Sequence, residues 1–236
     1  MQKSILIAGA GKGIGFELAK LLSTDENNSV FAVSRNISQL DKLANEINSK
    51  TDSPALINLA LDFTASNFPN VLEQSLEEYN FKPNVVIYNA GLLINKPFAE
   101  LTNSDFDQLF DINVKSAFRL FRMLLPRLDS GSHLLGISSM GGFQGSLKFP
   151  GLSLYSASKA ALAVLMECLA EELKDRQIKA NALALGSAQT EMLAQAFPGY
   201  KAPLSAKEMA VFVADFALNG SRYFNGKILP VSVSTP

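Results

Sequence analysis

The sequence predicts an α/β fold, a doubly wound domain with three α/β/α layers around a mostly parallel sheet of about seven strands. Short apolar runs typical of buried strands recur at roughly 25–30 residue intervals, and helical patterns lie between them. Glycines directly follow the first apolar run and open the first helical pattern. No linker, repeat or low-complexity tract interrupts the chain, so we expect residues 1–236 to form a single domain.

Composition excludes several classes of function. The 236 residues are 47% apolar, and 21 basic residues balance 22 acidic ones, so neither nucleic acid nor a membrane surface is an expected partner. The longest uncharged stretches are too mixed to span a bilayer. One histidine, His133, and one cysteine, Cys168, leave no metal site, and we expect Cys168 to be buried in a helix. The first strand begins too early for a signal peptide, which predicts a cytoplasmic protein.

The first strand, over residues 4–8, leads into a turn with glycines at Gly9, Gly13 and Gly15. Strand, glycine turn and helix in this order are typical of Rossmann-type dinucleotide binding. Gly9 permits the tight turn, Gly13 lets a pyrophosphate approach the backbone, and Gly15 lets the helix pack closely on the sheet. The helix N-terminus then offers free N–H groups to the diphosphate. Lys12 is followed by glycine rather than Ser or Thr, which excludes a Walker-type phosphate loop.

The second strand, over residues 30–34, ends where the choice between the two nicotinamide dinucleotides is made. NAD-binding units carry an acidic residue about 20 positions beyond the glycines, which binds the ribose 2′-hydroxyl. Here Ser34 takes that position, and Arg35 and Asn36 follow. Arg35 and Lys12 could bind a 2′-phosphate through charge-assisted hydrogen bonds. We therefore predict NADP(H), with NAD(H) as the less favoured alternative.

The remaining elements continue the alternation of strands and helices. Strands are predicted over residues 55–61, 84–88, 132–137, 178–185 and 227–233, and helices over 16–22, 37–47, 68–79, 104–128, 155–176 and 205–218. Ligands of such sheets bind beyond the carboxyl ends of the strands. Four chemistry-bearing positions directly follow predicted strand ends: Gly9, Ser34, Asp62 and Asn89. The last helix begins with a predicted capping box of Ser205 and Glu208, and Pro230 predicts an edge position or a bend for the last strand.

A tyrosine and a lysine lie one helical turn apart at the start of the helix over residues 155–176. Tyr155 and Lys159 therefore share a helix face and can reach the same small volume. A phenol titrates near pH ~10 and needs a nearby cation to exchange protons at neutral pH. The pair is thus the minimal machinery of a tyrosine acid/base.

Together these features resemble the short-chain dehydrogenase/reductase family, from Ile5 to about Val231. The motifs that carry the resemblance are Gly9-x-x-x-Gly13-x-Gly15, Asn89-Ala90-Gly91, Asn113, a serine after the fifth strand, Tyr155-x-x-x-Lys159, and Asn181-Ala followed by Gly186 and Thr190. The resemblance implies an NADP(H)-dependent oxidoreductase that transfers a hydride between the nicotinamide and a carbonyl or secondary alcohol substrate. It also implies a homodimer or homotetramer.

The resemblance implies four catalytic residues. Tyr155 would be the general acid/base, and Lys159 would lower its pKa and bind the nicotinamide ribose. Ser139 would orient the substrate carbonyl, and Asn113 would hold a helix distortion and a water molecule. Ser138 is the alternative serine, but the alternation of side chains along a strand would point it the other way.

The cofactor contacts combine the glycine turn with positions that the resemblance supplies. Asp62 and Phe63 would meet the adenine, and Ala188 with Thr190 would fix the carboxamide. The predicted cofactor-binding residues are Gly9, Lys12, Gly13, Ile14, Gly15, Ser34, Arg35, Asn36, Asp62, Phe63, Asn89, Ala90, Gly91, Tyr155, Lys159, Gly186, Ala188 and Thr190.

The chain departs from the family pattern in its spacing and at three places. Ser139 lies 16 residues before Tyr155, more than is usual, and we attribute the surplus to a short insertion in residues 143–153. Ala8 stands where a threonine is more common, Leu185 replaces a proline, and the C-terminus lacks the customary Asp-Gly-Gly.

Three loops, at about residues 92–97, 140–153 and 190–204, would surround the substrate, and the last of them is a candidate lid. Their apolar residues favour an apolar or aromatic carbonyl compound: Phe143, Leu147, Phe149, Leu152, Met192, Leu193 and Phe197. Two other functions stay open. A 3-oxoacyl-thioester reductase would need basic residues for an acidic carrier, for which Lys148 and Lys201 are the candidates. The other is a non-catalytic dinucleotide-binding regulator.

Overall fold

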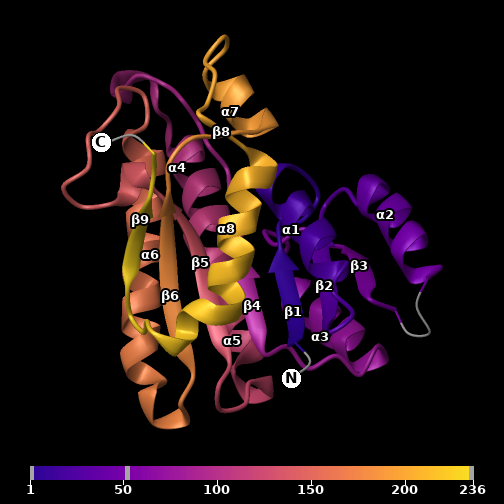
Figure 1. Cartoon of the computed structure of the whole chain (residues 1–236). Coiled ribbons are helices and arrows are strands. Elements are labelled where there is room, and N and C mark those ends of the chain that lie inside the picture. The colour runs from indigo at the N-terminus through magenta and orange to yellow at the C-terminus, as the bar shows by residue number, and fades with distance from the viewer. Residues whose placement is uncertain (1–2, 51–53, 234–236) are drawn as a thin grey trace.

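The computed structural model describes residues 3–50 and 54–233 (Figure 1). Residues 1–2 and 234–236, at the two ends of the predicted domain, lie outside the described residues. The C-terminal sequence that differs from the family pattern is therefore described only in part. The strands are β1 Lys3–Ala8, β2 Asn28–Ser34, β3 Leu56–Ala60, β4 Val85–Tyr88, β5 His133–Ser139, β6 Lys179–Leu185, β7 Ala188–Gln189, β8 Leu204–Ser205 and β9 Ile228–Val231. The α-helices are α1 Gly13–Ser23, α2 Ser38–Asn48, α3 Phe68–Glu78, α4 Asn103–Phe110, α5 Ser116–Leu124, α6 Ser153–Glu172, α7 Glu191–Ala196 and α8 Ala206–Asn219. A π-helical turn, η2 Asp111–Lys115, lies between α4 and α5, and 3-10 turns include η1 Phe98–Glu100, η3 Leu125–Arg127, η4 Met140–Gly142, η5 Lys174–Arg176 and η6 Gly220–Arg222.

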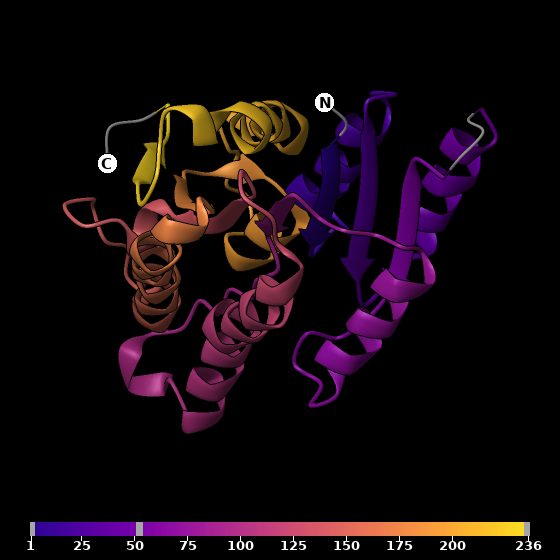
Figure 2. The ribbon, with the colours of Figure 1, turned by 90° about the horizontal axis from the view of Figure 1, so that it is seen from below.

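The predicted α/β fold with a seven-stranded sheet is confirmed. The strand order is β3-β2-β1-β4-β5-β6-β9, and every neighbouring pair is parallel. Apolar side chains on one face pack with α1, α2 and α8, and those on the other face pack with α3, α5 and α6. Figure 2 shows α8 on one side of the sheet and α5 and α6 on the other. Burial on both faces explains why the strands are continuous apolar runs.

The strand order reverses at β1, which pairs with β2 on one side and with β4 on the other. Gly9 follows β1 and Asn89 follows β4, and the Asn89 Nδ2 donates a hydrogen bond of 2.8 Å to the Gly9 carbonyl oxygen. Ligands of doubly wound sheets bind at this reversal, beyond the carboxyl ends of the strands. The topology therefore places both residues at the expected ligand crevice.

The segment predicted as a single helix over residues 104–128 is instead α4, the π-helical turn η2, α5 and a 3-10 turn. A π-helical turn inserts one extra residue and leaves carbonyl groups without their usual partners. Side chains supply those partners here: the Tyr88 hydroxyl donates to the Ile112 carbonyl oxygen, and the Ser116 Oγ donates to the Asp111 carbonyl oxygen at 2.7 Å. The helix distortion that the family resemblance implied at Asn113 is this turn.

The expectation that Cys168 is buried is wrong, because its side chain is exposed on α6. The helix is apolar around much of its circumference, but only one side, which carries Leu162, Ala163 and Met166, packs into the core. Within the described residues α6 is long and apolar enough to cross a bilayer by length and composition, and a third of that stretch is buried in the protein. Its packing on β5 and β6 is that of a sheet-covering helix.

The C-terminal elements agree with the predicted helix start and edge strand. The Ser205 Oγ accepts from the Glu208 N–H at 3.2 Å, and the Glu208 carboxylate accepts from the Ser205 N–H at 2.8 Å, so the capping box is present. Pro230 lies in β9, at the edge of the sheet. The segment predicted as a lid contains α7 and β8, and β8 pairs with β7.

The only histidine of the chain is a buried core residue of β5. The His133 Nδ1 lies 2.9 Å from the Ala217 carbonyl oxygen, and the Asn181 Nδ2 lies 3.1 Å from Nε2. With one nitrogen donating and the other accepting, the ring is neutral. Burial lowers the pKa of His133 to about 4, against the opposing effect of the Ala217 hydrogen bond.

This buried imidazole predicts a pH-dependent stability. The pKa of His133 in the unfolded chain is near 6.5, so as the pH falls from ~6.5 to ~4 the unfolded chain takes up a proton that the folded protein does not. The free energy of unfolding should therefore fall by about 3 kcal/mol across this range, beyond the contribution of the carboxylates. Urea unfolding at several pH values measures it. In His133→Gln the free energy of unfolding should change less between pH ~6.5 and ~4 than in the wild type. An identical pH dependence in the two proteins would contradict the lowered pKa of His133.

Candidate active site

Three glycines of the turn after β1 stand where the packing leaves no room for a Cβ. Gly9 has φ +87°, and a Cβ there would lie 2.6 Å from the backbone of Ala90. A Cβ on Gly15 would lie 2.0 Å from the Gly9 carbonyl oxygen. Gly11 was not among the predicted residues, yet a Cβ there would lie 2.2 Å from the Ser34 Oγ. Its place in the run of alternating glycines was the signal that could have found it.

The first turn of α1 suits an anionic ligand. No side chain of the described residues caps its N-terminus at Lys12, and none of its first-turn residues is acidic. The first N–H groups of a helix have no partner within the helix, and they carry the positive end of the helix dipole. Together with the close-packed glycines, they fit the diphosphate of a dinucleotide.

The residues predicted to bind the adenosine end lie at or just after the ends of β2 and β3, and none of them lines the cavity that contains Tyr155: Ser34, Arg35, Asn36, Asp62 and Phe63. Arg35 and Asn36 are exposed. Burial raises the pKa of Asp62, but hydrogen bonds from Thr64 and the nearby Arg35 guanidinium outweigh it, so the pKa is below its ordinary value. The Arg35 guanidinium is therefore close enough to attract the Asp62 carboxylate.

The prediction that Phe63 meets the adenine needs a correction for its side chain. Phe63 is 3% exposed, and its ring packs in the core against Phe68 and Tyr88, with ring centroids 5.3 and 6.2 Å away. Its apolar character draws it into the layer between the sheet and α3, as elsewhere in this core. Only the main chain of Phe63 is left for a ligand, and its carbonyl oxygen lies 2.8 Å from the Ser116 Oγ.

Asn113 lies in the π-helical turn, fully buried, and joins three parts of the site. Its Oδ1 accepts from the Leu92 N–H at 2.8 Å, and its Nδ2 donates to the Leu92 carbonyl oxygen and to the Ser158 Oγ at 3.0 and 2.9 Å. Ser158 in turn donates to the Tyr155 carbonyl oxygen at 2.8 Å. Ser158 was not predicted, and only its position next to Lys159 on the helix hinted at it.

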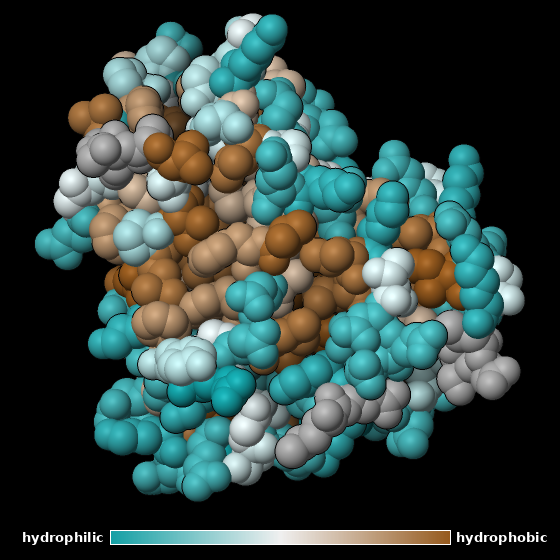
Figure 3. All heavy atoms as spheres, in the orientation of Figure 1, coloured by the Kyte–Doolittle hydropathy of each residue, from teal (hydrophilic) through white to brown (hydrophobic). Residues whose placement is uncertain are grey.

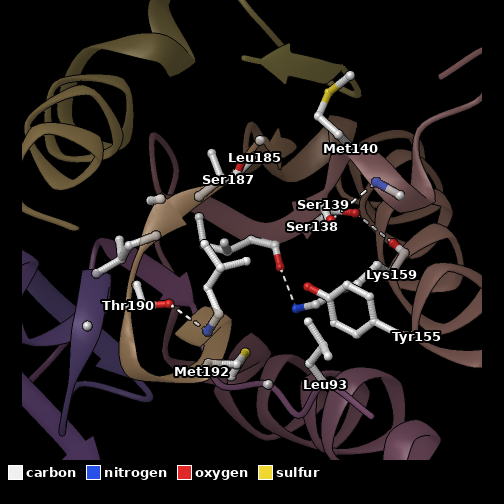
Figure 4. Close-up of a pocket in the computed structure, with 18 of the residues that line it drawn as sticks. Leu93, Ser138, Ser139, Met140, Tyr155, Lys159, Leu185, Ser187, Thr190 and Met192 are labelled. Carbon is white, nitrogen blue, oxygen red and sulfur yellow. Dashed lines mark hydrogen bonds between the residues drawn. The ribbon is translucent and has the colours of Figure 1, made fainter. Parts of the chain in front are cut away.

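Tyr155 and Lys159 project from α6 into the same part of the cavity (Figure 4). The Lys159 side chain is buried without a carboxylate partner among the described residues, and its Nζ donates to the Ile137 carbonyl oxygen at 2.9 Å. Burial lowers the pKa of Lys159 to about 8. Burial raises the pKa of Tyr155, and a hydrogen bond with Ser139 opposes part of that rise.

The two serines at the end of β5 have different partners, as the alternation along a strand predicts. The Ser139 hydroxyl bonds with Tyr155 and accepts from the Gly141 N–H at 3.2 Å. The Ser138 Oγ is buried and donates to the Lys159 carbonyl oxygen at 2.7 Å, which ties β5 to α6. Ser139 therefore stands beside the phenol, and Ser138 supports the helix that carries it (Figure 4).

Gly91 leaves the space that Lys159 occupies. A Cβ on Gly91 would lie 3.1 Å from the Lys159 Nζ and 3.2 Å from the Asn113 Oδ1. The loop after β4 thus passes closely over the buried ammonium and the amide. This contact brings three of the predicted site residues together.

A cavity of about 400 Å³ connects the glycine turn to Tyr155. Eleven of the predicted residues line it: Lys12, Gly13, Ile14, Asn89, Gly91, Ser139, Tyr155, Lys159, Gly186, Ala188 and Thr190. The other nine predicted residues do not line it: Gly9, Gly15, Ser34, Arg35, Asn36, Asp62, Phe63, Ala90 and Asn113. Apolar residues form much of the wall: Leu93, Ile137, Met140, Phe149, Leu152, Leu185, Met192, Leu193 and Phe197. Glu191 and Ser187 also line it and were not predicted; each follows a predicted family position by one residue.

Comparison with known proteins agrees with this arrangement. The family model for the short chain dehydrogenase matches residues 3–201. The chain belongs to the short-chain dehydrogenase family. It is therefore an oxidoreductase of that family, as the motifs in the sequence had implied.

Relatives within this family have similar lengths. An uncharacterized oxidoreductase of Staphylococcus epidermidis is 26% identical over 226 residues, which covers 95% of this chain and 94% of that protein. A 3-oxoacyl-(acyl-carrier-protein) reductase of Thermotoga maritima is 29% identical over 214 residues, which covers 89% of this chain and 81% of that protein.

Solved structures share the fold of this short-chain dehydrogenase. A short chain dehydrogenase from Burkholderia cenocepacia, in complex with NADP, has a TM-score of 0.84 at 23% identity, with 98% of this chain and 96% of that one covered. A 4-hydroxyisoleucine dehydrogenase complexed with NADH also has a TM-score of 0.84, at 22% identity, with 98% and 97% covered.

Proposed function

We propose that this protein is an NADP(H)-dependent carbonyl reductase, or alcohol dehydrogenase in the reverse direction. The observation that carries the proposal is the position of Tyr155, Lys159 and Ser139 in one cavity whose other end is the glycine turn. A phenol, a buried ammonium and a hydroxyl beside a dinucleotide cradle are the groups that a proton-coupled hydride transfer needs.

Each side chain has a separate role in the proposed reaction. A bound NADP(H) would supply or accept the hydride. The Tyr155 hydroxyl donates a proton to the substrate oxygen during reduction and takes it back during oxidation. The Lys159 Nζ lies 6.0 Å from the centre of the Tyr155 ring, and its positive charge stabilises the phenolate that remains. The Ser139 hydroxyl donates a second hydrogen bond to the substrate oxygen and orients it.

The cavity favours a neutral, apolar substrate. Near Tyr155 its wall is made of Leu93, Met140, Phe149 and Leu152, and α7 contributes Met192. Its charged residues lie with the predicted cofactor contacts: Lys12 in the glycine turn, Lys159 on α6 and Glu191 beside Gly13. A charged substrate group would lose its hydration in the apolar part without gaining a partner. We therefore propose apolar or aromatic aldehydes and ketones as the substrate class.

Arg35 supports the proposal of NADP(H) over NAD(H), because it is exposed at the end of β2 where an acidic residue would exclude a phosphate. Arg35→Ala should weaken NADPH binding about tenfold or more and change NADH binding little, since charge-assisted hydrogen bonds are among the stronger ones. Fluorescence titration with both dinucleotides measures this. Lys42→Ala, an exposed cation on α2, is the control. An equal loss of affinity for NADPH and NADH in Arg35→Ala, or a preference of the wild type for NADH, would contradict the proposal of NADP(H).

A 3-oxoacyl-thioester reductase is the second candidate, favoured by the Thermotoga maritima relative. An acidic carrier would need exposed cations around the cavity. The Lys148 Nζ instead donates to the Phe143 carbonyl oxygen and the Ser146 Oγ within its own loop, at 2.6 and 2.7 Å. Lys201 is exposed and follows Tyr200, which lines the cavity, so it is the single candidate cation of the two that stays available to a carrier. The contacts of Lys148 within its own loop weigh against carrier docking and in favour of free carbonyl compounds.

The test is NADPH oxidation with a panel of aldehydes, ketones, quinones and 3-oxoacyl thioesters. We expect turnover with neutral apolar carbonyls and little with charged analogues of the same size. Preference for the thioesters would select the second candidate. Binding of NADPH without oxidation across the whole panel would favour a dinucleotide-binding regulator.

We also propose that the protein assembles as a dimer or tetramer. Large apolar side chains are exposed on three helices: Phe106 on α4, Phe118 on α5 and Val164 on α6. On the face shown in Figure 3, apolar side chains also gather over α8 and β9, where Phe212 is exposed. Exposed apolar surface of this kind marks interfaces. A monomer by light scattering would refute this proposal.

A further inference from the structure

Asn95 lies where the three loops around the cavity meet. Its Nδ2 donates a hydrogen bond of 2.9 Å to the carbonyl oxygen of Ala196, the last residue of α7. The next residue, Lys96, donates from its N–H to the Gly151 carbonyl oxygen at 3.0 Å. Gly151 has φ +84°, and a Cβ there would lie 2.0 Å from the Asn95 Oδ1. One short segment thus contacts both of the other loops.

The loop that carries Asn95 is itself held firmly at both ends. At its start, Leu92 exchanges two hydrogen bonds with the buried Asn113 amide. At its end, the Lys96 Nζ lies 2.8 and 2.9 Å from the two carboxylate oxygens of Asp105. Asp105 also forms the capping box of α4 with Thr102. The loop that carries Asn95 is therefore bound at one end to the π-helical turn and at the other end to α4.

The helix α7 has little support of its own. It has six residues, and its N-terminus is capped by Thr190, whose Oγ1 accepts from the Leu193 N–H at 3.2 Å. A helix this short is marginal unless other parts of the protein hold it. Yet Met192 and Leu193 from α7, and Phe197 directly after it, form part of the cavity wall. Displacement of α7 would therefore remove part of this wall and open the cavity further.

We propose that Asn95 is a positioning residue that holds α7 against the loop over residues 92–97 and so keeps the cavity closed. The effect of Asn95 on catalysis rests on the proposed function, whereas its effect on the position of α7 does not. The hydrogen bond to Ala196 is exposed to solvent, so water competes for it. Its loss should change the ratio of closed to open forms by about fivefold. A contact of this strength holds the wall in place and still allows substrate to enter and product to leave.

Limited proteolysis tests the closure without any substrate. Lys201 is exposed in the segment after α7, and trypsin cleavage there requires that segment to detach. We expect Asn95→Ala and Asn95→Asp to be cleaved after Lys201 about fivefold faster than the wild type. The Asp variant keeps the shape of the side chain and removes the donor, so it separates the hydrogen bond from packing.

Two further variants sharpen the test. Asn219→Ala removes an exposed asparagine on α8 that donates to Asp215 at 2.8 Å, and it should leave cleavage at Lys201 unchanged. Gly151→Ala should speed cleavage as Asn95→Ala does, because its Cβ would displace Asn95 from the opposite side. Unchanged cleavage in both Asn95 variants would overturn the proposal. Equal acceleration at tryptic sites far from α7 would also overturn it, since that indicates general destabilisation.

Kinetics give the second readout. With a carbonyl substrate found by the panel, Asn95→Ala should raise KM about fivefold and leave kcat unchanged or higher, because an open wall weakens retention of substrate and speeds release. A fall in kcat at constant KM would overturn the positioning role. If no carbonyl is turned over at all, the proposed function fails while the proteolysis result still decides the closure.

Discussion

Replacement of Tyr155 by Phe should lower kcat for carbonyl reduction about 1000-fold, within the range that general acid–base groups contribute. The phenylalanine ring fills the same space on α6 but has no proton to donate and no bond with Ser139. Turnover is measured by NADPH oxidation with the best substrate of the panel.

The matched measurement for Tyr155→Phe is NADPH binding. The glycine turn and the first turn of α1 are untouched, so the dissociation constant should stay within a few-fold of the wild-type value. The companion variant Tyr200→Phe removes another hydroxyl at the cavity, which lies 3.0 Å from the Ser187 Oγ. It should keep most of the activity. Retention of wild-type turnover by Tyr155→Phe would refute the assignment of the acid.

Replacement of Lys159 by Met should lower kcat about 100-fold or more, because the cation that stabilises the developing phenolate is lost. Met retains the apolar stem of the lysine in its buried position. The Lys159 Nζ donates to the Ile137 carbonyl oxygen, and that bond is lost as well. A moderate fall in stability is therefore expected, which thermal unfolding would measure separately.

The buried ammonium also sets a pH dependence. Burial lowers the pKa of Lys159 to about 8, so the side chain is charged below that pH and neutral above it. For carbonyl reduction, kcat/KM for NADPH, which reports groups of the free enzyme, should fall as the pH rises through about 8. The Lys159→Met variant should lack this decline. A wild-type profile that stays flat to pH ~10, or an unchanged decline in the variant, would contradict this role for the lysine.

The sequence predicted the sheet well because each strand is buried on both faces and carries a continuous apolar signal. The glycine turn was predictable for a related reason: Gly9 and Gly15 each stand where a Cβ would meet backbone within 2.6 Å. Such positions accept only glycine, and a glycine is visible in the sequence. The spacing of Tyr155 and Lys159 likewise followed from helix geometry alone.

Features that depend on tertiary contacts were not predictable in the same way. The π-helical turn at Asn113 is stabilised by Tyr88 and Ser116, whose side chains reach carbonyl oxygens of the turn. The exposure of Cys168 depends on which side of an apolar helix faces the sheet, and the burial of the Phe63 ring depends on the packing between β3 and α3. No local pattern in the sequence specifies these pairings.

The central claim is that this cavity transfers hydride to a carbonyl carbon with Tyr155 as the proton donor. The most direct measurement uses NADPH deuterated at the transferred position, with product analysis by mass spectrometry. The claim predicts an alcohol that carries a single deuterium at the former carbonyl carbon, formed by the wild type and nearly absent with Tyr155→Phe. Tight NADPH binding without any deuterated alcohol across the panel, or equal labelling by Tyr155→Phe, would contradict it.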